Sequence, residues 1–263
     1  MTKLELKTLL KKADNNLLES IIQRITSSKN GKLYKTDSYI IYTIGVDNED
    51  GHLNGVLCFN DNCNKEVLNT ANKFFKPMNR NYVIWIRNHA DKNLEKILLK
   101  EGYKPKREPG SSGMVIKEKI KSVKIPKGFE VKEVKSSKEI NDFSLVIKNS
   151  FNKPSIVSRE MVNGEEILTS SNTKTFIIYE KNIPVAAASM VISDTVAGIY
   201  WVGTIKEKRG LGLGSYITKV ATNAGFDSGA KRVILQASEA GERVYKKLGY
   251  ETITHYKCYP ITV

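Results

Sequence analysis

The sequence has little of what secreted, membrane-spanning and metal-binding proteins rely on. Its three cysteines, Cys58, Cys63 and Cys258, are an odd number, and without a Cys-x-x-Cys pair or a histidine cluster they form no zinc motif. No run of about 18 apolar residues is present, so we expect no membrane-spanning helix. Residues 1–7 show no apolar stretch of the signal-peptide kind. These absences predict a reduced, cytoplasmic protein without a metal.

Acidic residues are also few, because 28 Asp and Glu stand against 42 Lys and Arg and give a net charge of +14. A balance this basic brings nucleic acid into consideration as a partner. The lysines, however, are spread over nearly every segment, and Pro126 interrupts the densest run, residues 116–127, which reads as a solvated linker. We therefore expect no nucleic-acid partner, whereas a polyanionic small ligand suits the charge.

A charged segment divides the chain. With 263 residues, 40% of them apolar, the chain is long enough for one large domain or two modest ones. Residues 117–128 are rich in lysine, end in Pro-Lys-Gly and separate two regions with apolar patterning. We predict two lobes, one over residues 1–120 and the other over residues 128–263.

Both lobes are predicted to alternate strands and helices. In the first half we expect helices over residues 3–28, 67–75 and 93–100, and strands over 39–45, 55–59, 82–87 and 114–117. In the second half we expect helices over 138–151, 158–170, 212–226 and 240–248, and strands over 129–134, 175–180, 185–192, 197–204, 232–237 and 252–260.

The two halves resemble each other at one place. Residues 93–103 and 242–250 each follow an apolar strand, and each reads as a helix that ends at a glycine followed by tyrosine. Gly102 and Gly249 are expected in the left-handed conformation that ends many helices. We interpret the halves as a tandem repeat. Chance is the alternative, because helix endings of this kind are common.

The most informative stretch is residues 208–215, Lys-Arg-Gly-Leu-Gly-Leu-Gly-Ser. Its three alternating glycines follow a predicted strand and lead into a predicted helix. Glycine lets a backbone approach a ligand closely, and the free N–H groups of a first helical turn bind phosphate. A helix-entry turn without a ligand is the alternative, although such a turn needs fewer glycines. At the equivalent place the first half reads Asn-Asp-Asn-Cys-Asn-Lys-Glu, residues 60–66, which contains no glycine.

With this loop the second half resembles the GNAT-type N-acetyltransferases. Their phosphate-loop motif, Arg/Gln-x-x-Gly-x-Gly/Ala, is matched by Arg209, Gly212 and Gly214. Their second motif is a strand, then Asn-x-x-Ala-x-x-x-Tyr, closing on Leu-Gly-Phe/Tyr. Residues 238–250 keep its spacing, with serine in place of asparagine and glycine in place of alanine. The first half resembles the degenerate GNAT-like lobe that is fused in front of some bacterial members.

The resemblance implies a fold and an activity. The implied fold is of the α/β class, with the mixed sheet of an α+β protein. Its tandem GNAT-like lobes are built around a central twisted sheet that is flanked by helices. The activity is transfer of an acetyl group from acetyl-CoA to a primary amine by direct attack, in the second lobe alone. The strands over 200–204 and 233–238 splay apart to admit the pantetheine arm. The residues implied in cofactor binding are Val202, Gly203, Thr204, Lys208, Arg209, Gly210, Leu211, Gly212, Leu213, Gly214, Ser215 and Ser238.

Catalytic roles also follow from motif position. A backbone N–H at or next to Val202 would stabilise the oxyanion. Tyr245 occupies the general-acid position, where its hydroxyl would protonate the leaving thiolate. The alternative for Tyr245 is a tyrosine that packs its ring in the core. Ser238 is shorter than the family's asparagine, so its reach to the cofactor is in doubt.

The general base is where this sequence departs from the family. Many members place a glutamate on the strand before the loop, but residues 198–204 contain no carboxylate. The other candidates are Glu160, Glu165, Glu166, Asp194 and His255, and each is better explained as a surface or structural group. We therefore assign no base, and the acceptor amine stays unidentified. Because the base is missing, a non-catalytic acyl-CoA-binding sensor is the alternative function.

Overall fold

The computed structural model describes residues 2–48, 50–60, 63–162 and 170–263. The elements of the first half are α1 (Lys3–Ser27), β1 (Lys32–Lys35), β2 (Tyr39–Thr43), β3 (Asn54–Cys58), α2 (Lys65–Phe75), β4 (Tyr82–Arg87), α3 (Lys92–Lys100) and β5 (Ser111–Ile116). Those of the second half are β6 (Phe129–Glu133), α4 (Ser137–Phe151), α5 (Ser155–Glu160), β7 (Thr173–Glu180), β8 (Ile183–Ser193), β9 (Val196–Thr204), α7 (Leu213–Asp227), β10 (Arg232–Ala237), α8 (Glu239–Lys247) and β11 (Glu251–Ile261).

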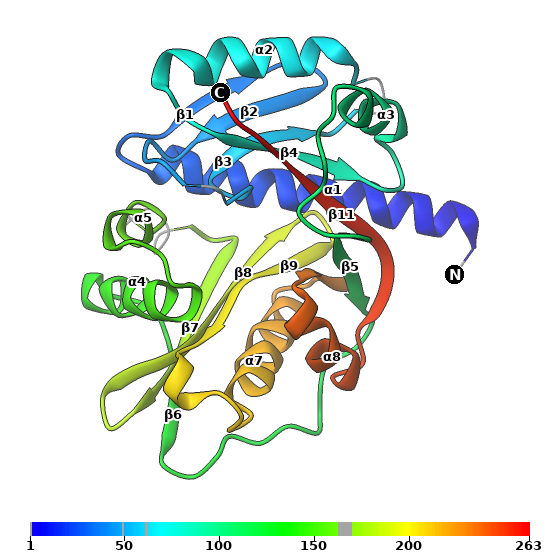
Figure 1. The fold of residues 1–263 in the computed structure, drawn as a ribbon. Coiled ribbons are helices and arrows are strands. Elements are labelled where there is room, and N and C mark those ends of the chain that lie inside the picture. Colours follow the sequence, from blue (N-terminus) through cyan, green and yellow to red (C-terminus); the bar gives the residue numbers. More distant parts are fainter. Residues whose placement is uncertain (1, 49, 61–62, 163–169) are drawn as a thin grey trace.

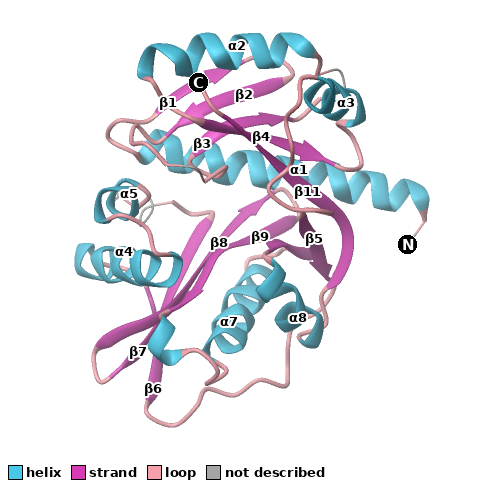
Figure 2. Ribbon diagram, viewed as in Figure 1, coloured by secondary structure: helices cyan, strands magenta, loops and turns pink. Residues whose placement is uncertain are grey.

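The strands of the described residues form one eleven-stranded sheet in the order β1-β2-β3-β4-β11-β5-β10-β9-β8-β7-β6. We call β1–β4 with α1–α3 the first lobe, and β6–β10 with α4–α8 the second lobe. Helices flank the sheet in both lobes (Figures 1 and 2). Parallel pairs, β3 with β4 and β9 with β10, occur among antiparallel ones. The predicted α/β fold with a mixed sheet is therefore confirmed.

The two strands at the centre of the sheet join the lobes. The C-terminal strand β11 pairs antiparallel with β4 of the first lobe, and also with β5. Strand β5, which ends the first half of the chain, pairs antiparallel with β10 of the second lobe. Each of these strands therefore bonds to the other half of the chain. The predicted division into residues 1–120 and 128–263 stays a prediction, and the sheet runs through both halves.

Helix α1 lies between the two lobes (Figure 1). It begins with a capping box in which Thr2 and Glu5 satisfy each other's backbone N–H groups. In its middle, the Asn16 amide donates to the carbonyl oxygens of Val191 and Val196, at 3.0 and 3.2 Å, and accepts from the Tyr200 hydroxyl at 2.8 Å. These bonds join a helix of the first lobe to strands β8 and β9 of the second.

A buried charge cluster ties α1 to the sheet. Arg87 on β4 pairs with Asp14 of α1 at 3.0 Å and with Asp91 at 2.7 Å. Tyr256 on β11 donates its hydroxyl to Asp14 at 2.8 Å. None of these three charged groups is more than 4% exposed. Breaking a buried ion pair leaves an uncompensated charge, so this cluster resists separation of α1, β4 and β11.

Most predicted elements occur within a few residues of their expected bounds. Strand β1 was not predicted, because its sequence Lys-Leu-Tyr-Lys gives no apolar run. The helix expected over 158–170 begins earlier as α5 and ends at Glu160, while residues 163–169 lie outside the described residues. Gly102 and Gly249 have φ of 86° and 95°, which confirms both expected helix ends.

The cysteines require a correction. Cys58 at the end of β3 and Cys63 before α2 form a disulfide, whereas Cys258 is free. The prediction of a fully reduced protein is therefore wrong for this pair. The odd count led to it, but the turn after β3 brings two Cα atoms 6.5 Å apart, within the range that a disulfide spans.

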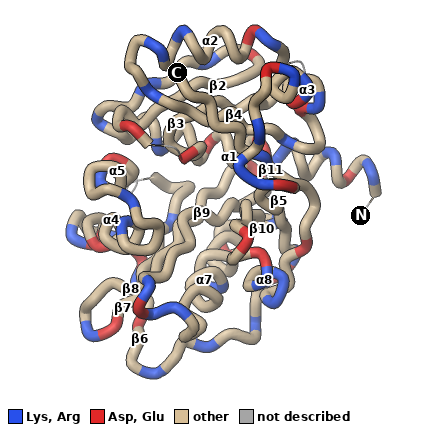
Figure 3. Tube along the Cα trace, viewed as in Figure 1, with Lys and Arg blue, Asp and Glu red and all other residues tan. Residues whose placement is uncertain are grey.

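Lys and Arg residues lie along helices and loops of both lobes (Figure 3). Within the described ranges, no helix is both long and apolar enough to cross a bilayer.

Candidate functional site

The glycine loop leads into the N-terminus of α7. Gly210 and Gly212 have φ of 82° and 80°, a left-handed conformation that favours glycine, and a Cβ at either position would meet open space. Gly212 is the N-cap of α7 and supplies no side chain to the first turn. The N–H groups of Leu213, Gly214 and Ser215 therefore depend on a ligand or solvent for partners. An anion is the preferred ligand of such a helix end.

Charged residues beside the loop already have protein partners. Arg209 donates to the carbonyl oxygens of Thr204 at 3.2 Å and Ser150 at 2.8 Å. Lys208 pairs with Glu180 at 2.6 Å. Both side chains thus hold the loop against β7, β9 and α4, and a phosphate would share them with these partners.

The matching place in the first lobe is satisfied by the chain itself. Asn64 is the N-cap of α2, and its side chain accepts the backbone N–H of Glu66 at 2.8 Å. Residues 61–62 lie outside the described residues, but the helix end next to them already has its cap. This contrast agrees with the expectation that only the second lobe holds the phosphates.

Strands β9 and β10 separate beyond their first four residue pairs. Their parallel pairing runs from Val196 and Arg232 to Ile199 and Leu235, and stops there. Past this point β9 bulges, because Trp201 and Val202 together oppose the single residue Ala188 on β8. A cavity of about 170 Å³ lies in the opening. Its lining residues are Asp50, His52, Phe151, Ile199, Tyr200, Trp201, Val202, Leu235, Gln236, Ser238 and Tyr245.

Tyr245 on α8 lines this cavity, where the second motif predicts it. Burial raises the pKa of its hydroxyl to about 12, so the group is protonated at neutral pH. Within the described part of the chain, no residue hydrogen-bonds to this hydroxyl. A Cβ on Gly241 would lie 2.9 Å from the Tyr245 ring, which explains why glycine replaces the motif's alanine.

Ser238 has a structural task as well as a place in the cavity. It is the N-cap of α8, and its hydroxyl oxygen accepts the backbone N–H of Gly241 at 3.2 Å. The hydroxyl proton stays available to a ligand, so the cofactor role of Ser238 stays a prediction.

Sequence reasoning missed two cavity residues, Asp50 and His52, which belong to the loop between β2 and β3 of the first lobe. Asp50 pairs with Lys153 of the second lobe at 2.7 Å and accepts the His52 backbone N–H at 2.9 Å. The His52 ring packs against Trp85 and Trp201, with ring centroids 4.8 and 5.5 Å apart. Its Nδ1 atom is buried and has no hydrogen-bond partner among the described residues. Burial lowers the pKa of His52 to about 4, which leaves the ring neutral at pH 7.

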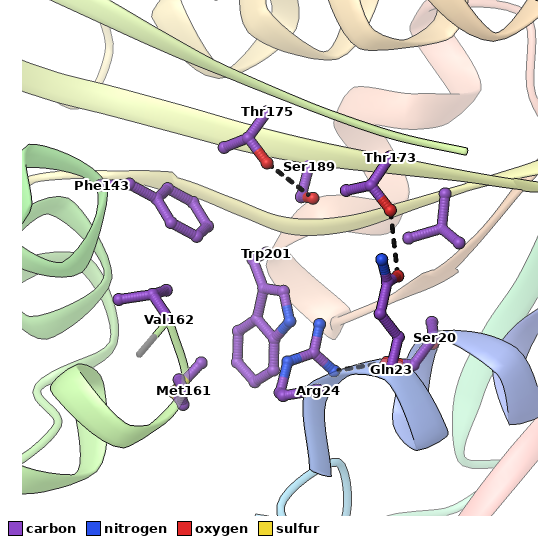
Figure 4. A pocket seen from close by; sticks show the side chains of 11 residues that line it. Ser20, Gln23, Arg24, Phe143, Met161, Val162, Thr173, Thr175, Ser189 and Trp201 are labelled. Atoms are coloured by element: carbon purple, nitrogen blue, oxygen red, sulfur yellow. Dashed lines mark hydrogen bonds between the residues drawn. The ribbon is translucent and has the colours of Figure 1, made fainter. Parts of the chain in front are cut away.

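A second cavity, of about 30 Å³, is also lined by Trp201 (Figure 4). Arg24 of α1 reaches into it, with its guanidinium carbon 4.8 Å from the centroid of the Trp201 ring. The side chain is 9% exposed and donates to the carbonyl oxygen of Ser20 at 3.3 Å. No described carboxylate pairs with it, and burial lowers its pKa to about 10. No local pattern in the sequence distinguishes this arginine from the surface cations of α1.

Of the base candidates from the sequence, the three that lie among the described residues do not line the cavity between β9 and β10. Asp194 pairs with Lys12 at 2.7 Å in the turn that precedes β9. Glu160 accepts the Ser28 hydroxyl at 2.9 Å, and His255 lies opposite Ser112 in the β5–β11 ladder. Glu165 and Glu166 fall outside the described residues.

Comparisons with known proteins identify the second half of the chain. Residues 135–258 match the family described as the acetyltransferase (GNAT) domain. A search among curated proteins finds no match.

Solved structures match nearly the whole chain. A GCN5-related N-acetyltransferase from Kribbella flavida is 19% identical, with 95% of each chain covered and a TM-score of 0.69. A tandem GNAT protein from the clavulanic acid biosynthesis pathway is 8% identical, with 94% of this chain and 87% of the other covered and a TM-score of 0.65. A functionally unknown protein from Staphylococcus epidermidis is 17% identical, with 89% and 94% covered and a TM-score of 0.60. At these identities the likeness establishes the fold, which is that of tandem GNAT lobes.

Proposed function

The chain belongs to the GNAT acetyltransferase superfamily through residues 135–258, and we propose that its second lobe transfers an acetyl group from acetyl-CoA to a primary amine. The observation that carries the proposal is the cavity in the opening between β9 and β10, which is lined both by Val202 of the β9 bulge and by Tyr245 of α8. Acyl transfer needs an oxyanion donor and a proton donor near one carbonyl, and this cavity brings both types of group together.

The cofactor would lie along features of the second lobe. We place its pyrophosphate on the N–H groups at the start of α7, where Gly212 leaves the helix end uncapped. The pantetheine arm would follow the edge of β9 from Thr204 toward Val202, since β10 no longer pairs with that part of the strand. The thioester then reaches the cavity that Tyr245 lines.

The reaction is a direct attack with two proton transfers. The amine nitrogen forms a bond to the thioester carbon, and a backbone N–H at or next to Val202 stabilises the oxyanion. The carbon–sulfur bond then breaks, and Tyr245 gives its proton to the CoA thiolate. His52 accepts the proton that the amine loses, because its buried Nδ1 lacks a partner in the same cavity. The first lobe thus supplies the base that β9 lacks.

One acetyl-CoA is expected to bind per chain, because α2 of the first lobe is capped by Asn64 whereas α7 is not. Calorimetric titration should give a stoichiometry near one, and amines should stimulate release of free CoA thiol. A stoichiometry near two contradicts the loss of the first site. Tight binding without thiol release on a broad amine panel favours the acyl-CoA sensor instead.

His52→Gln is expected to lower kcat by about 10–100-fold, since a positioned proton acceptor is lost while water remains as a poorer one. The loss should be the same at pH 6 and pH 8, because the pKa of about 4 keeps His52 neutral at both. Steady-state kinetics checks this, with His255→Gln as a matched control outside the cavity. If the two variants lose rate equally, His52 is not the base.

A further inference from the structure

Arg24 is a buried cation that pairs with no anion among the described residues. It lies on α1 of the first lobe, it is 9% exposed, and its guanidinium donates to the backbone carbonyl oxygen of Ser20. Among residues 2–48, 50–60, 63–162 and 170–263, no carboxylate lies within ion-pair distance of it. By contrast, the buried Arg87 forms ion pairs with two aspartates, Asp14 and Asp91.

Burial of an unpaired charge is costly, and the cation–π contact with Trp201 compensates only in part. The pKa of Arg24, lowered by burial, reflects that cost. Proteins retain such a group where a ligand supplies the opposite charge. The neighbouring indole points to the same conclusion, because Trp201 Nε1 is buried and has no partner among the described residues.

The position of Arg24 relates it to the acetyl-transfer site. Trp201 lines both cavities, so its ring separates Arg24 from the cavity that holds His52 and Tyr245. His52 packs on the same indole. The indole nitrogen faces the side on which the Arg24 guanidinium lies (Figure 4). An acceptor that occupies both cavities would pass the Trp201 ring, with its amine next to His52 and its other end next to Arg24.

The size and lining of the Arg24 cavity limit what it accepts. About 30 Å³ holds a small polar group but no second ring or chain. Among the described residues that line it, Arg24 is the charged one, and it lies among hydroxyl groups of Thr173, Thr175 and Ser189 and apolar side chains. The planar fork of a guanidinium matches the two oxygens of a carboxylate.

We propose that the acceptor is a small molecule with a primary amine and a carboxylate, and that Arg24 and Trp201 Nε1 bind the carboxylate while the amine attacks acetyl-CoA. This inference rests on the proposed function of the same site. It makes the first lobe the specificity-determining part of the enzyme, because α1 supplies the anion receptor.

The experiment compares matched amines in the purified full-length protein. Glycine, β-alanine, γ-aminobutyrate and L-lysine are assayed beside analogues in which the carboxylate is an amide, with thiol release as the readout. At least one amino acid is expected to have a kcat/KM about 10–100-fold above its amide, the range for one charged hydrogen-bonded contact. In Arg24→Met this preference should disappear through KM, with the KM for acetyl-CoA unchanged. Arg24→Lys should retain part of it.

The outcomes separate this inference from the proposed function. Equal use of acids and amides, or a preference for O-phosphoethanolamine over the amino acids, overturns the carboxylate assignment and leaves acetyl transfer intact. Absence of thiol release with every amine overturns the proposed function itself. A structural Arg24 predicts a lower thermal midpoint for Arg24→Met. We expect an equal or higher midpoint without ligands, because an unpaired buried charge is removed. In the presence of CoA, adding the amino acid should raise the midpoint of the wild type but not that of Arg24→Met.

Discussion

Tyr245→Phe is expected to lower kcat by about 10²-fold or more, the low end for loss of a positioned proton donor. Tyr245 lines the cavity between β9 and β10, and a pKa of about 12 keeps its hydroxyl protonated until the thiolate forms. Affinity for acetyl-CoA should change little, because phenylalanine keeps the ring that packs beside Tyr250 and Gly241. Single-turnover kinetics and calorimetry measure the two quantities separately.

Tyr250→Phe is the matched control for this substitution. Its hydroxyl is fully buried and hydrogen-bonded to Thr222 at 2.7 Å, outside the cavity lining. Its loss should lower thermal stability and leave the chemical step nearly unchanged. If Tyr245→Phe behaves like Tyr250→Phe, losing stability but not rate, Tyr245 is a packing residue and water protonates the thiolate.

Gly212→Asp and Gly214→Asp are expected to abolish binding of acetyl-CoA. Each carboxylate would stand at the uncapped start of α7 and repel the pyrophosphate that these N–H groups attract. At Gly214 a Cβ meets only Thr204 Oγ1 at 3.6 Å, so this variant should fold normally. Gly212 has φ of 80°, so its variant also carries backbone strain.

Gly102→Asp is the control that distinguishes the effect of backbone strain in Gly212→Asp from the effect of its added charge. Gly102 has φ of 86° and open space around its Cβ, as Gly212 has, but it ends α3 in the first lobe. Its variant should lose stability and keep full affinity in calorimetry. Unchanged affinity in both Gly212→Asp and Gly214→Asp would remove the loop from the cofactor site.

Much of the candidate site was predictable because its signals are local. The apolar spacing of α7 and α8, the alternating glycines before α7 and the helix end at Gly249 are each set by neighbouring residues. The residues of both motifs lie in one continuous segment, so their spacing along the chain largely determines where they lie in the fold. For the same reason β4 and β10 occur at their predicted bounds.

The sequence by itself therefore determined the family, most of the elements and the position of the glycine loop at the start of α7. Tertiary structure alone decided that β11 pairs with β4, that Cys58 pairs with Cys63, and that His52 and Arg24 reach Trp201. His52 lies 149 positions and Arg24 177 positions before Trp201 in the sequence, and no pattern near either residue predicts that it contacts Trp201. They meet because α1 packs between the lobes, and only the packed sheet puts a first-lobe cation and imidazole beside a second-lobe cavity.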